Sequence, residues 1–266
     1  MMRNALRCTM VATLACCLAL AGCATVPAGE ATQPDDPLEP INRVVFNANI
    51  ALDDAIIRPV AEAYRAVVPL FVRDRIRSVL DNLAEPRIFA NDLLQGRADA
   101  AAITFARFTV NSLQGLGGLF DVATAQDLPR QTGDFGQTLY TWGVGDGPYL
   151  VLPLFGPSNG RDAIGLGVDL FTTPPAWLFP GHTGEIINFS VGIVGATDLR
   201  SRNIETLDEI KASALDYYTH LKSVSWQYRE KQLHEASQVK QEPQELEDPG
   251  ASDKPAPPPA PAPPPE

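Results

Sequence analysis

Glycine and proline interrupt the apolar segments in the middle of this chain, and they restrict the length of every element there. The apolar pieces that they separate lie at 113–120, 149–155, 163–171 and 176–179. Because proline removes a backbone donor and glycine adds conformational freedom, no long helix or strand is expected in this region. No piece offers the ~20 uncharged residues that span a bilayer. Two interpretations remain open: a body lying in one membrane leaflet, and a buried core with irregular loops.

Apolar periodicity predicts helices around this region. In residues 73–83 the apolar side chains recur at helical spacing, and Pro86 predicts that the helix ends before it. Residues 98–113 form a second predicted helix that is apolar on nearly every side, which is typical of a helix buried by protein or by lipid.

The longest helical signal runs through residues 203–236, where apolar residues alternate steps of three and four. Asn203 or Thr206 is expected to cap its start, and Glu209 is placed to complete a capping box around Thr206. No alternating strand pattern extends beyond a few residues. The sequence therefore predicts an all-α fold.

The first residues have the pattern of an export signal that ends in a cysteine. Arg3 and Arg7 precede an uncharged apolar stretch, and Leu20-Ala-Gly-Cys23 follows it. This arrangement predicts a lipoprotein signal peptide over residues 1–22, with Cys23 acylated and, since position 24 is not Asp, sorting to the outer membrane. The alternative is an ordinary signal peptide with an incidental cysteine. All four cysteines lie at or before position 23, so the body is expected to have no disulfide.

Composition separates a folded body from two polar ends. Residues 23–35 are small and aperiodic and are expected to form a lipidated tether. Residues 236–266 are acidic and proline-rich, and they offer too little apolar surface to fold, so they are predicted to be a disordered tail. One helical domain is expected over residues 36–235.

One motif could carry catalysis, but its surroundings are wrong for it. Gly156-Pro-Ser-Asn-Gly160 matches the nucleophile elbow of serine hydrolases, with Ser158 as the nucleophile. Such an enzyme would need an acid and a histidine further along the chain, and the candidates are Asp169 or Asp198 and His220 or His234. The elbow belongs between a strand and a helix of an α/β sheet, whereas Pro153 interrupts the preceding run. An esterase therefore stays an alternative only.

Other ligand classes are disfavoured. The formal net charge of −11 argues against binding to nucleic acid. Gly143-Val-Gly-Asp-Gly147 lacks the spacing of a nucleotide loop and is interpreted as a turn. The histidines are scattered, so we expect no metal and no cofactor. The paired acids are interpreted as helix starts or solvated faces: Asp53 with Asp54, and Asp208 with Glu209.

A series of motifs over residues 36–162 resembles the MlaA/VacJ family of outer-membrane phospholipid-transport lipoproteins. The matching segments are Asp36-Pro-Leu-Glu-Pro-Ile-Asn-Arg43, Asn91-Asp-Leu-Leu-Gln-Gly96, Arg107-Phe-Thr-Val-Asn-Ser112, Gly115-Leu-Gly-Gly-Leu-Phe-Asp121, Asp134-Phe-Gly-Gln-Thr138, Trp142-Gly-Val-Gly-Asp-Gly-Pro-Tyr149 and Gly156-Pro-Ser-Asn-Gly-Arg-Asp162. Beyond residue 172 the match is looser, and Trp226-Gln-Tyr-Arg229 departs from the family's basic ending.

The resemblance implies a ring-like helical domain in the inner leaflet of the outer membrane, on its periplasmic face. An amphipathic channel in such a ring removes mislocalised phospholipid from the outer leaflet. The partners implied are a trimeric porin and a soluble periplasmic phospholipid carrier.

The resemblance also implies that no residue is catalytic and that Gly156 to Gly160 is a turn. Arg107 and Arg161 are interpreted either as headgroup guides or as structural ion pairs, and the channel-lining residues are not assigned. A second function stays open, which is a scaffold lipoprotein that supports porins or the envelope without moving lipid.

Overall fold

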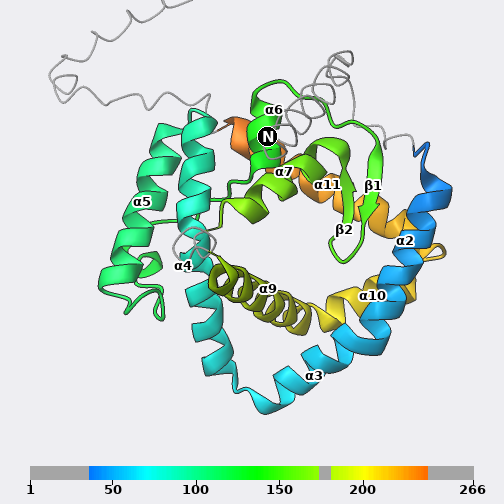
Figure 1. Ribbon diagram of the computed structural model, residues 1–266, viewed down its shortest axis with the longest axis horizontal. Helices are drawn as coiled ribbons and strands as arrows, with labels where there is room; N and C mark the ends of the chain where they lie inside the picture. The colour runs from blue at the N-terminus through cyan, green and yellow to red at the C-terminus, as the bar shows by residue number, and fades with distance from the viewer. Residues whose placement is uncertain (1–35, 174–180, 239–266) are drawn as a thin grey trace, which may run out of the picture.

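The computed structural model describes residues 36–173 and 181–238, and its elements are arranged around a ring (Figure 1). The ring begins with α2 (Glu39–Leu52), the π-helical turn η1 (Asp53–Ile57) and α3 (Arg58–Val67), followed by α4 (Leu70–Leu94) and α5 (Ala98–Leu113). The 3-10 turn η2 (Thr124–Gln126) then leads to α6 (Phe135–Thr141), the strands β1 (Tyr149–Leu152) and β2 (Gly156–Asn159), and α7 (Gly160–Phe171). The described part ends with α9 (His182–Arg202), α10 (Ile204–Ser213) and α11 (Tyr217–Gln238).

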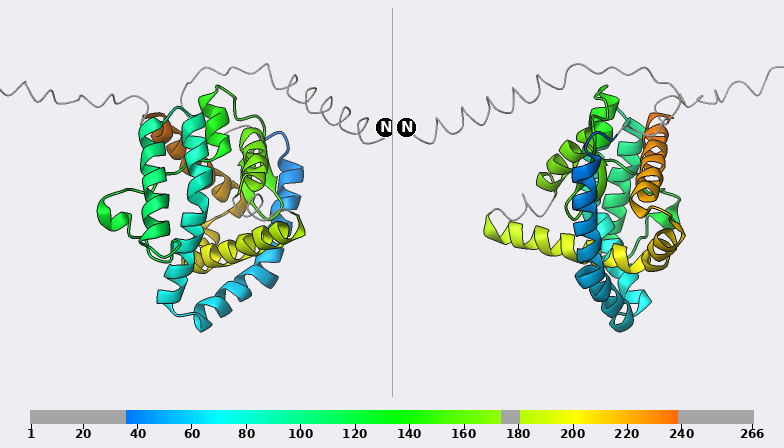
Figure 2. Two further views of the ribbon diagram at one scale, coloured as in Figure 1. Left: turned by 60° about the vertical axis from the view of Figure 1, so that its left-hand side comes forward. Right: turned by 90° about the vertical axis from the view of Figure 1, so that its right-hand side faces the viewer.

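The helices do not all lie in the plane of the ring. In the right-hand view of Figure 2, α9 extends beyond one face, whereas α10 and α11 lie toward the other. The chain that returns from α9 through α10 to α11 therefore crosses the thickness of the ring.

The ring closes where α11 meets α2 and the hairpin. Phe46 packs edge-on against Tyr217 and Tyr218, with ring centroids 5.3 and 5.4 Å apart. The Asp36 carboxylate accepts hydrogen bonds from the Tyr218 hydroxyl and from Asn42. Tyr149 of β1 completes this small apolar core, so the first and last described helices are fastened to each other.

Helix α4 corrects the prediction of a helix that ends before Pro86. The helix runs on to Leu94, with Pro86 inside it. A proline costs one hydrogen bond of the helix, but contacts between helices on both sides of it hold the direction of α4. Glu85 pairs with Arg107 of α5. Seven residues later, Asp92 accepts a hydrogen bond from Thr104 of α5 at 2.9 Å.

The single long helix predicted over residues 203–236 is also wrong. The backbone becomes extended at Ala214, which separates α10 from α11. Asp216 starts the second helix, since its carboxylate accepts hydrogen bonds from the Tyr218 amide and the Thr219 hydroxyl. Arg43 of α2 binds the same carboxylate at 2.6 Å. This distant partner stabilises a break that the local pattern does not reveal.

The predicted capping box is absent from α10. The helix begins at Ile204, so Thr206 lies inside it and cannot cap it. Asn203 holds the N-cap position, but its side chain donates to the Leu199 carbonyl of α9 instead. The close succession of α9 and α10 offers Asn203 this other partner.

A two-stranded hairpin is the sheet found among the described residues, so the all-α prediction is confirmed as the class of the fold. Tyr149 pairs with Asn159 and Leu152 pairs with Gly156, so residues 156–159 form a strand and not the expected turn. Two asparagines of α2 hold the hairpin. Asn42 donates to the Tyr149 carbonyl at 3.0 Å, and Asn49 donates to the Leu152 carbonyl at 2.9 Å. These contacts join segments more than 100 residues apart in the sequence.

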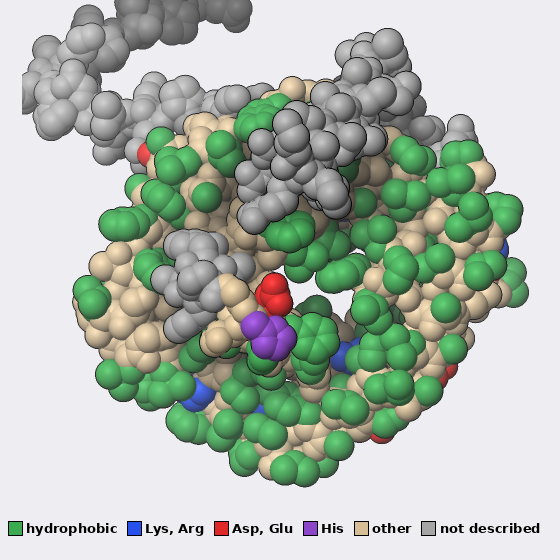
Figure 3. Space-filling model, in the orientation of Figure 1, with side chains coloured by type: hydrophobic (Ala, Val, Ile, Leu, Met, Phe, Trp, Pro, Cys, Tyr) green, Lys and Arg blue, Asp and Glu red, His purple; other side chains and the backbone are tan. Residues whose placement is uncertain are grey.

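Outside the small apolar core, many of the buried side chains are polar and many large apolar side chains are exposed. The largest fully buried side chains are polar ones: Arg107, Gln95, Gln137 and Glu85. Large apolar side chains are exposed, among them Val67 at 80%, Phe71 at 64%, Leu154 at 68% and Phe171 at 85%. Figure 3 shows hydrophobic side chains over much of one face. Apolar surface of this extent marks contact with a membrane or another protein.

None of the described helices combines the length and the apolar composition needed to cross a bilayer.

Candidate functional site

Figure 3 shows an opening through the centre of the ring. Two adjoining cavities lie among the helices of the ring. The first, of about 360 Å³, lies among α4, α6, the hairpin, α7 and α11. The second, of about 250 Å³, lies among α4, α7 and α9. Arg87, Leu166 and Asp169 line both cavities and therefore mark the junction between them.

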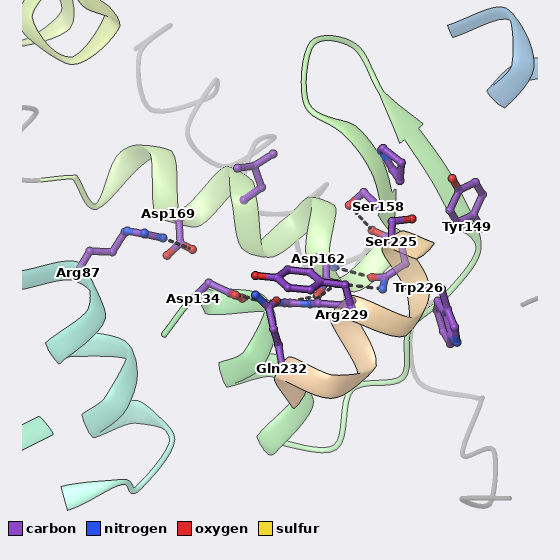
Figure 4. Close-up of a pocket in the computed structure, with 14 residues that line it drawn as sticks. Arg87, Asp134, Tyr149, Ser158, Asp162, Asp169, Ser225, Trp226, Arg229 and Gln232 are labelled. Carbon is purple, nitrogen blue, oxygen red and sulfur yellow. Dashed lines mark hydrogen bonds and ion pairs between the residues drawn. The ribbon is translucent and has the colours of Figure 1, made fainter. Parts of the chain in front are cut away.

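The first cavity has a charged wall centred on Arg229 of α11 (Figure 4). Its guanidinium binds Asp134 through Nη1 and Nη2, at 2.7 and 2.8 Å. It also binds Asp162 through Nε and Nη2, at 2.8 and 2.9 Å. A fifth hydrogen bond goes from Nη1 to Gln232. Every nitrogen of Arg229 is therefore engaged, and α11 is fastened to the N-termini of α6 and α7.

The positions of the two acids follow from the way in which their helices begin. Asp134 caps α6, accepting a hydrogen bond from the Gln137 amide at 2.8 Å. Asn159 caps α7 in the same way through the Asp162 amide, which places Asp162 in the first turn. Carboxylates at helix N-termini are favoured by the helix dipole. Contacts within their own helices thus hold both acids in place, in addition to those from Arg229.

Helices α6 and α7 cross closely enough to require glycine. A Cβ at Gly165 would lie 2.4 Å from the backbone nitrogen of Gly136, and one at Gly136 would lie 2.4 Å from Asp162 Oδ1. The two glycines therefore bring the helix ends together and leave room for the Arg229 guanidinium.

The charged groups of this wall favour an ionised Asp162. Burial alone would raise the pKa of its carboxyl. Hydrogen bonding and charge attraction from Arg229, together with the charge of Arg161, outweigh that effect, so the pKa lies below its ordinary value. Asp162 therefore carries a negative charge in the cavity wall at neutral pH.

Arg87 and Asp169 form the second charged contact, at the junction of the cavities. Arg87 Nη1 lies 2.8 Å from Asp169 Oδ2, and the Asp169 side chain is 8% exposed. Asp169 also accepts from the Phe135 amide at 3.0 Å and from Asn91 at 3.2 Å. The second cavity is otherwise mainly apolar, and its apolar lining is Leu80, Leu83, Ala84, Leu166, Leu170 and Val191. A charged space therefore adjoins an apolar one.

Ser158 lines the first cavity without the partners of a nucleophile. Its Oγ donates to the Asn159 carbonyl at 3.4 Å. Within the described ranges no histidine is found hydrogen-bonded to it, and the candidate acids have other partners: Arg87 for Asp169, and Arg202 for Asp198. His220 and His234 both lie on α11, where His234 faces Glu230 at 3.6 Å. Among the described residues, the candidate acids and Ser158 therefore have partners other than those of a serine hydrolase.

Both arginines considered as headgroup guides form buried ion pairs, which confirms the structural interpretation. Arg107 is 2% exposed and contacts Glu85 at 3.1 Å and Asp121 at 3.2 Å. Arg161, also 2% exposed, contacts Asp146 at 2.5 Å and Asp162 at 3.1 Å. Neither arginine lines either of the two cavities.

The remaining candidates have simpler roles. Among the paired acids, Asp53 binds Arg200 and Asp54 binds Lys211, so these two acids join η1 to α9 and α10. Gly143 and Gly147 have φ of 86° and 68°, as the expected turn requires. In the part of the chain that is described, no three metal-ligating side chains gather. Cys23, the tether and most of the tail lie outside the described residues.

Sequence reasoning did not single out Arg87, Asp134 or Arg229 as site residues. Arg229 lies 95 residues from Asp134 and 67 from Asp162, so no local pattern links them. The available signal was the helix-capping pattern at Asp134 and Asn159, two polar residues that each follow a glycine within three positions, Gly133 and Gly156.

The chain is similar to proteins of one lipoprotein family. The family model described as MlaA lipoprotein matches residues 34–232. The intermembrane phospholipid transport system lipoprotein MlaA of Haemophilus influenzae is 31% identical over 217 residues, which are 79% of this chain and 85% of that protein. Its counterpart of the same name in Escherichia coli is 39% identical over 171 residues, 62% of this chain and 68% of that protein.

One solved structure is also similar, and it comes from work on the structural basis for maintenance of bacterial outer membrane lipid asymmetry. It covers 76% of this chain and 99% of its own, with a TM-score of 0.63 and 33% sequence identity.

Proposed function

Because this chain belongs to the MlaA lipoprotein family, we propose that it moves phospholipid through its central opening and so maintains the lipid asymmetry of the outer membrane. Phospholipid that has reached the outer leaflet enters the ring and leaves toward a soluble periplasmic carrier. The proposal is supported by the relatives, which are named for intermembrane phospholipid transport.

The observation that carries this function is the charged cavity beside an apolar one, inside a ring whose outer surface is rich in exposed apolar side chains. A phospholipid headgroup that moves through hydrocarbon must lose its hydration, and burying an unpaired charge costs many kcal/mol. Fixed charges such as those of Arg87 and Asp134 replace part of that hydration. Exposed apolar side chains such as Phe71 suit contact with acyl chains.

Transport of this kind is not enzymatic, because moving a lipid requires no covalent step. The Ser158 hydroxyl, hydrogen-bonded to the backbone, has no assigned role in it. Acylation of Cys23 anchors the protein in the inner leaflet, with the ring at the periplasmic face of the membrane. A trimeric porin is the partner that we propose beside it, since exposed apolar helix faces are available for such a contact.

The test is the amount of phospholipid in the outer leaflet of a strain that lacks this gene. Deletion is expected to raise it, and expression of the wild type or of Ser158→Ala is expected to restore it. Cys23→Ala should fail to do so, because the protein loses its anchor.

The other outcomes distinguish the alternatives. If deletion leaves outer-leaflet phospholipid at the wild-type level, and the protein from the wild-type strain co-purifies with a porin, the scaffold function replaces transport. If Ser158→Ala fails to restore the wild-type amount of outer-leaflet phospholipid although the variant is folded and abundant, an esterase function replaces transport.

A further inference from the structure

Arg87 lines both cavities and so lies where they meet. Figure 4 shows it beside Asp169, and part of its hydrogen-bonding capacity is not used by the protein. A guanidinium has five N–H donors. Arg87 Nη1 donates to Asp169, and over residues 36–173 and 181–238 its side chain is found in no other hydrogen bond. The side chain is 24% exposed. Donors therefore remain for a ligand in the cavity.

The other charged groups of the wall are more fully committed. Asp169 accepts from Arg87, Asn91 and the Phe135 amide, and it is almost entirely buried. Arg229 uses all three of its nitrogens on protein oxygens. Of the two arginines that line the first cavity, Arg87 is thus the one able to bind an incoming anion.

The two spaces beside Arg87 match the two parts of an amphiphile. On one side lies the apolar cavity, with Leu83 and Val191 in its wall. On the other side lies the charged cavity, where the side chain of Asp134 is 31% exposed. The wall of the charged cavity carries three acids and two arginines, so its net charge is negative. A ligand with a net negative charge is therefore disfavoured in this cavity, whereas the cationic end group of a ligand is attracted.

We propose that Arg87 binds the phosphate of a zwitterionic phospholipid, whose ammonium group faces the Asp134 side of the charged cavity and whose glycerol end lies toward the apolar cavity. This inference rests on the proposed transport function and specifies the lipid that the site accepts. Arginine suits the task because its planar fork binds phosphate oxygens with charge-assisted hydrogen bonds. The site therefore prefers phosphatidylethanolamine to phosphatidylglycerol.

The experiment measures phospholipid retained by the purified, acylated, full-length protein. The protein is incubated with vesicles of equal parts phosphatidylethanolamine and phosphatidylglycerol, re-isolated in mild detergent, and its bound lipid is extracted and quantified by headgroup. Wild type is expected to retain phosphatidylethanolamine in excess. Arg77→Gln is the matched control, since Arg77 lies on the same helix, pairs with Asp81, and touches neither cavity.

Two variants separate lipid binding from the structural ion pair. Arg87→Gln combined with Asp169→Asn removes both charges, so no buried carboxylate loses its partner. It is expected to lower the retained lipid about tenfold, as the loss of a charge-assisted hydrogen bond implies. Asp169→Asn alone keeps Arg87 and removes one negative charge, so it should retain more phosphatidylglycerol than wild type. If the pair has only a structural role, the two variants behave alike.

Each result decides between the two proposals. If wild type retains phospholipid and the double variant retains the same amount as Arg77→Gln, the Arg87 site is wrong and transport stands. If wild type retains both lipids equally, the headgroup preference is overturned. If wild type retains no phospholipid under conditions where it is folded, both the site and the proposed function fall.

Discussion

Arg107 is enclosed by protein on every side, and it illustrates what single residues contribute here. The sequence places it in a motif and leaves two roles open, a guide for headgroups or an ion pair. The structure decides for the second, with Glu85, Asp121 and the Leu128 carbonyl around its guanidinium. The motif predicts the charged side chain. Its partners come from α4 and from the segment after α5, so the motif alone does not predict its role.

At the same scale, the charge network around Asp162 predicts how stability depends on pH. The folded-state pKa of Asp162 is lowered. Its contribution to the free energy of unfolding is therefore fully present above the ordinary carboxyl pKa near 4. That contribution is lost as the pH falls through the folded-state pKa. Asp162→Asn should cost about 1.5–3 kcal/mol at pH 7. The difference should shrink as the pH approaches 3.

The measurement is urea unfolding of wild type and Asp162→Asn in the same detergent at pH 7, 5 and 3. Glu209→Gln serves as the control, since Glu209 is exposed within α10. A difference in unfolding free energy between wild type and Asp162→Asn that is equal at pH 7 and pH 3 would contradict the account.

The elements vary in how far the sequence reveals them. The helix over residues 98–113 is predicted with its bounds, because its pattern is local and its ends are marked. The break at Ala214 and the hairpin are not predicted from the sequence. Arg43 and the asparagines of α2 stabilise them from more than 100 residues away, so no local pattern reveals them. Helix α4 passes through Pro86 for a similar reason, since its contacts with α5 outweigh a local signal.

The close crossing of α6 and α7 predicts a contrast between two glycines of one helix. Gly165→Ala places a Cβ 2.4 Å from the Gly136 backbone, so the helices must separate and the Arg229 network must loosen. We expect a loss of about 2–4 kcal/mol, in the range of severe overpacking. Gly167→Ala meets no atom within 4 Å and should gain up to about 1 kcal/mol from helix propensity.

Thermal and urea unfolding of the two variants, measured side by side, test this contrast. Equal effects of the two substitutions would mean that the crossing tolerates a methyl group, and the glycines would then not position the site.

For the whole molecule, the exposed apolar side chains predict binding to lipid that does not depend on the proposed acyl anchor at Cys23. In a form that carries Cys23→Ala, Phe71→Glu should lower the fraction bound to phospholipid vesicles about tenfold, since one aromatic side chain contributes about 1.5–3 kcal/mol on burial. Phe71 is 64% exposed, so the folded protein should keep its unfolding temperature.

Gln227→Glu adds the same charge at an exposed position of α11 and should bind vesicles like the unsubstituted form. Flotation with vesicles measures both variants. If they float equally well, the apolar side chains around Phe71 do not contact lipid.

The many exposed apolar side chains also change what stability means for this molecule. A protein with many large apolar side chains at its surface has a folded state that includes the medium around it. Where hydrocarbon covers those side chains, each lipid that does so acts as a weak ligand of the folded form. The free energy of unfolding then depends on the acyl composition and thickness of the leaflet, in the same way that the stability of a binding protein depends on the concentration of its ligand. The same chain is accordingly more robust in one membrane than in another, with no change in its sequence.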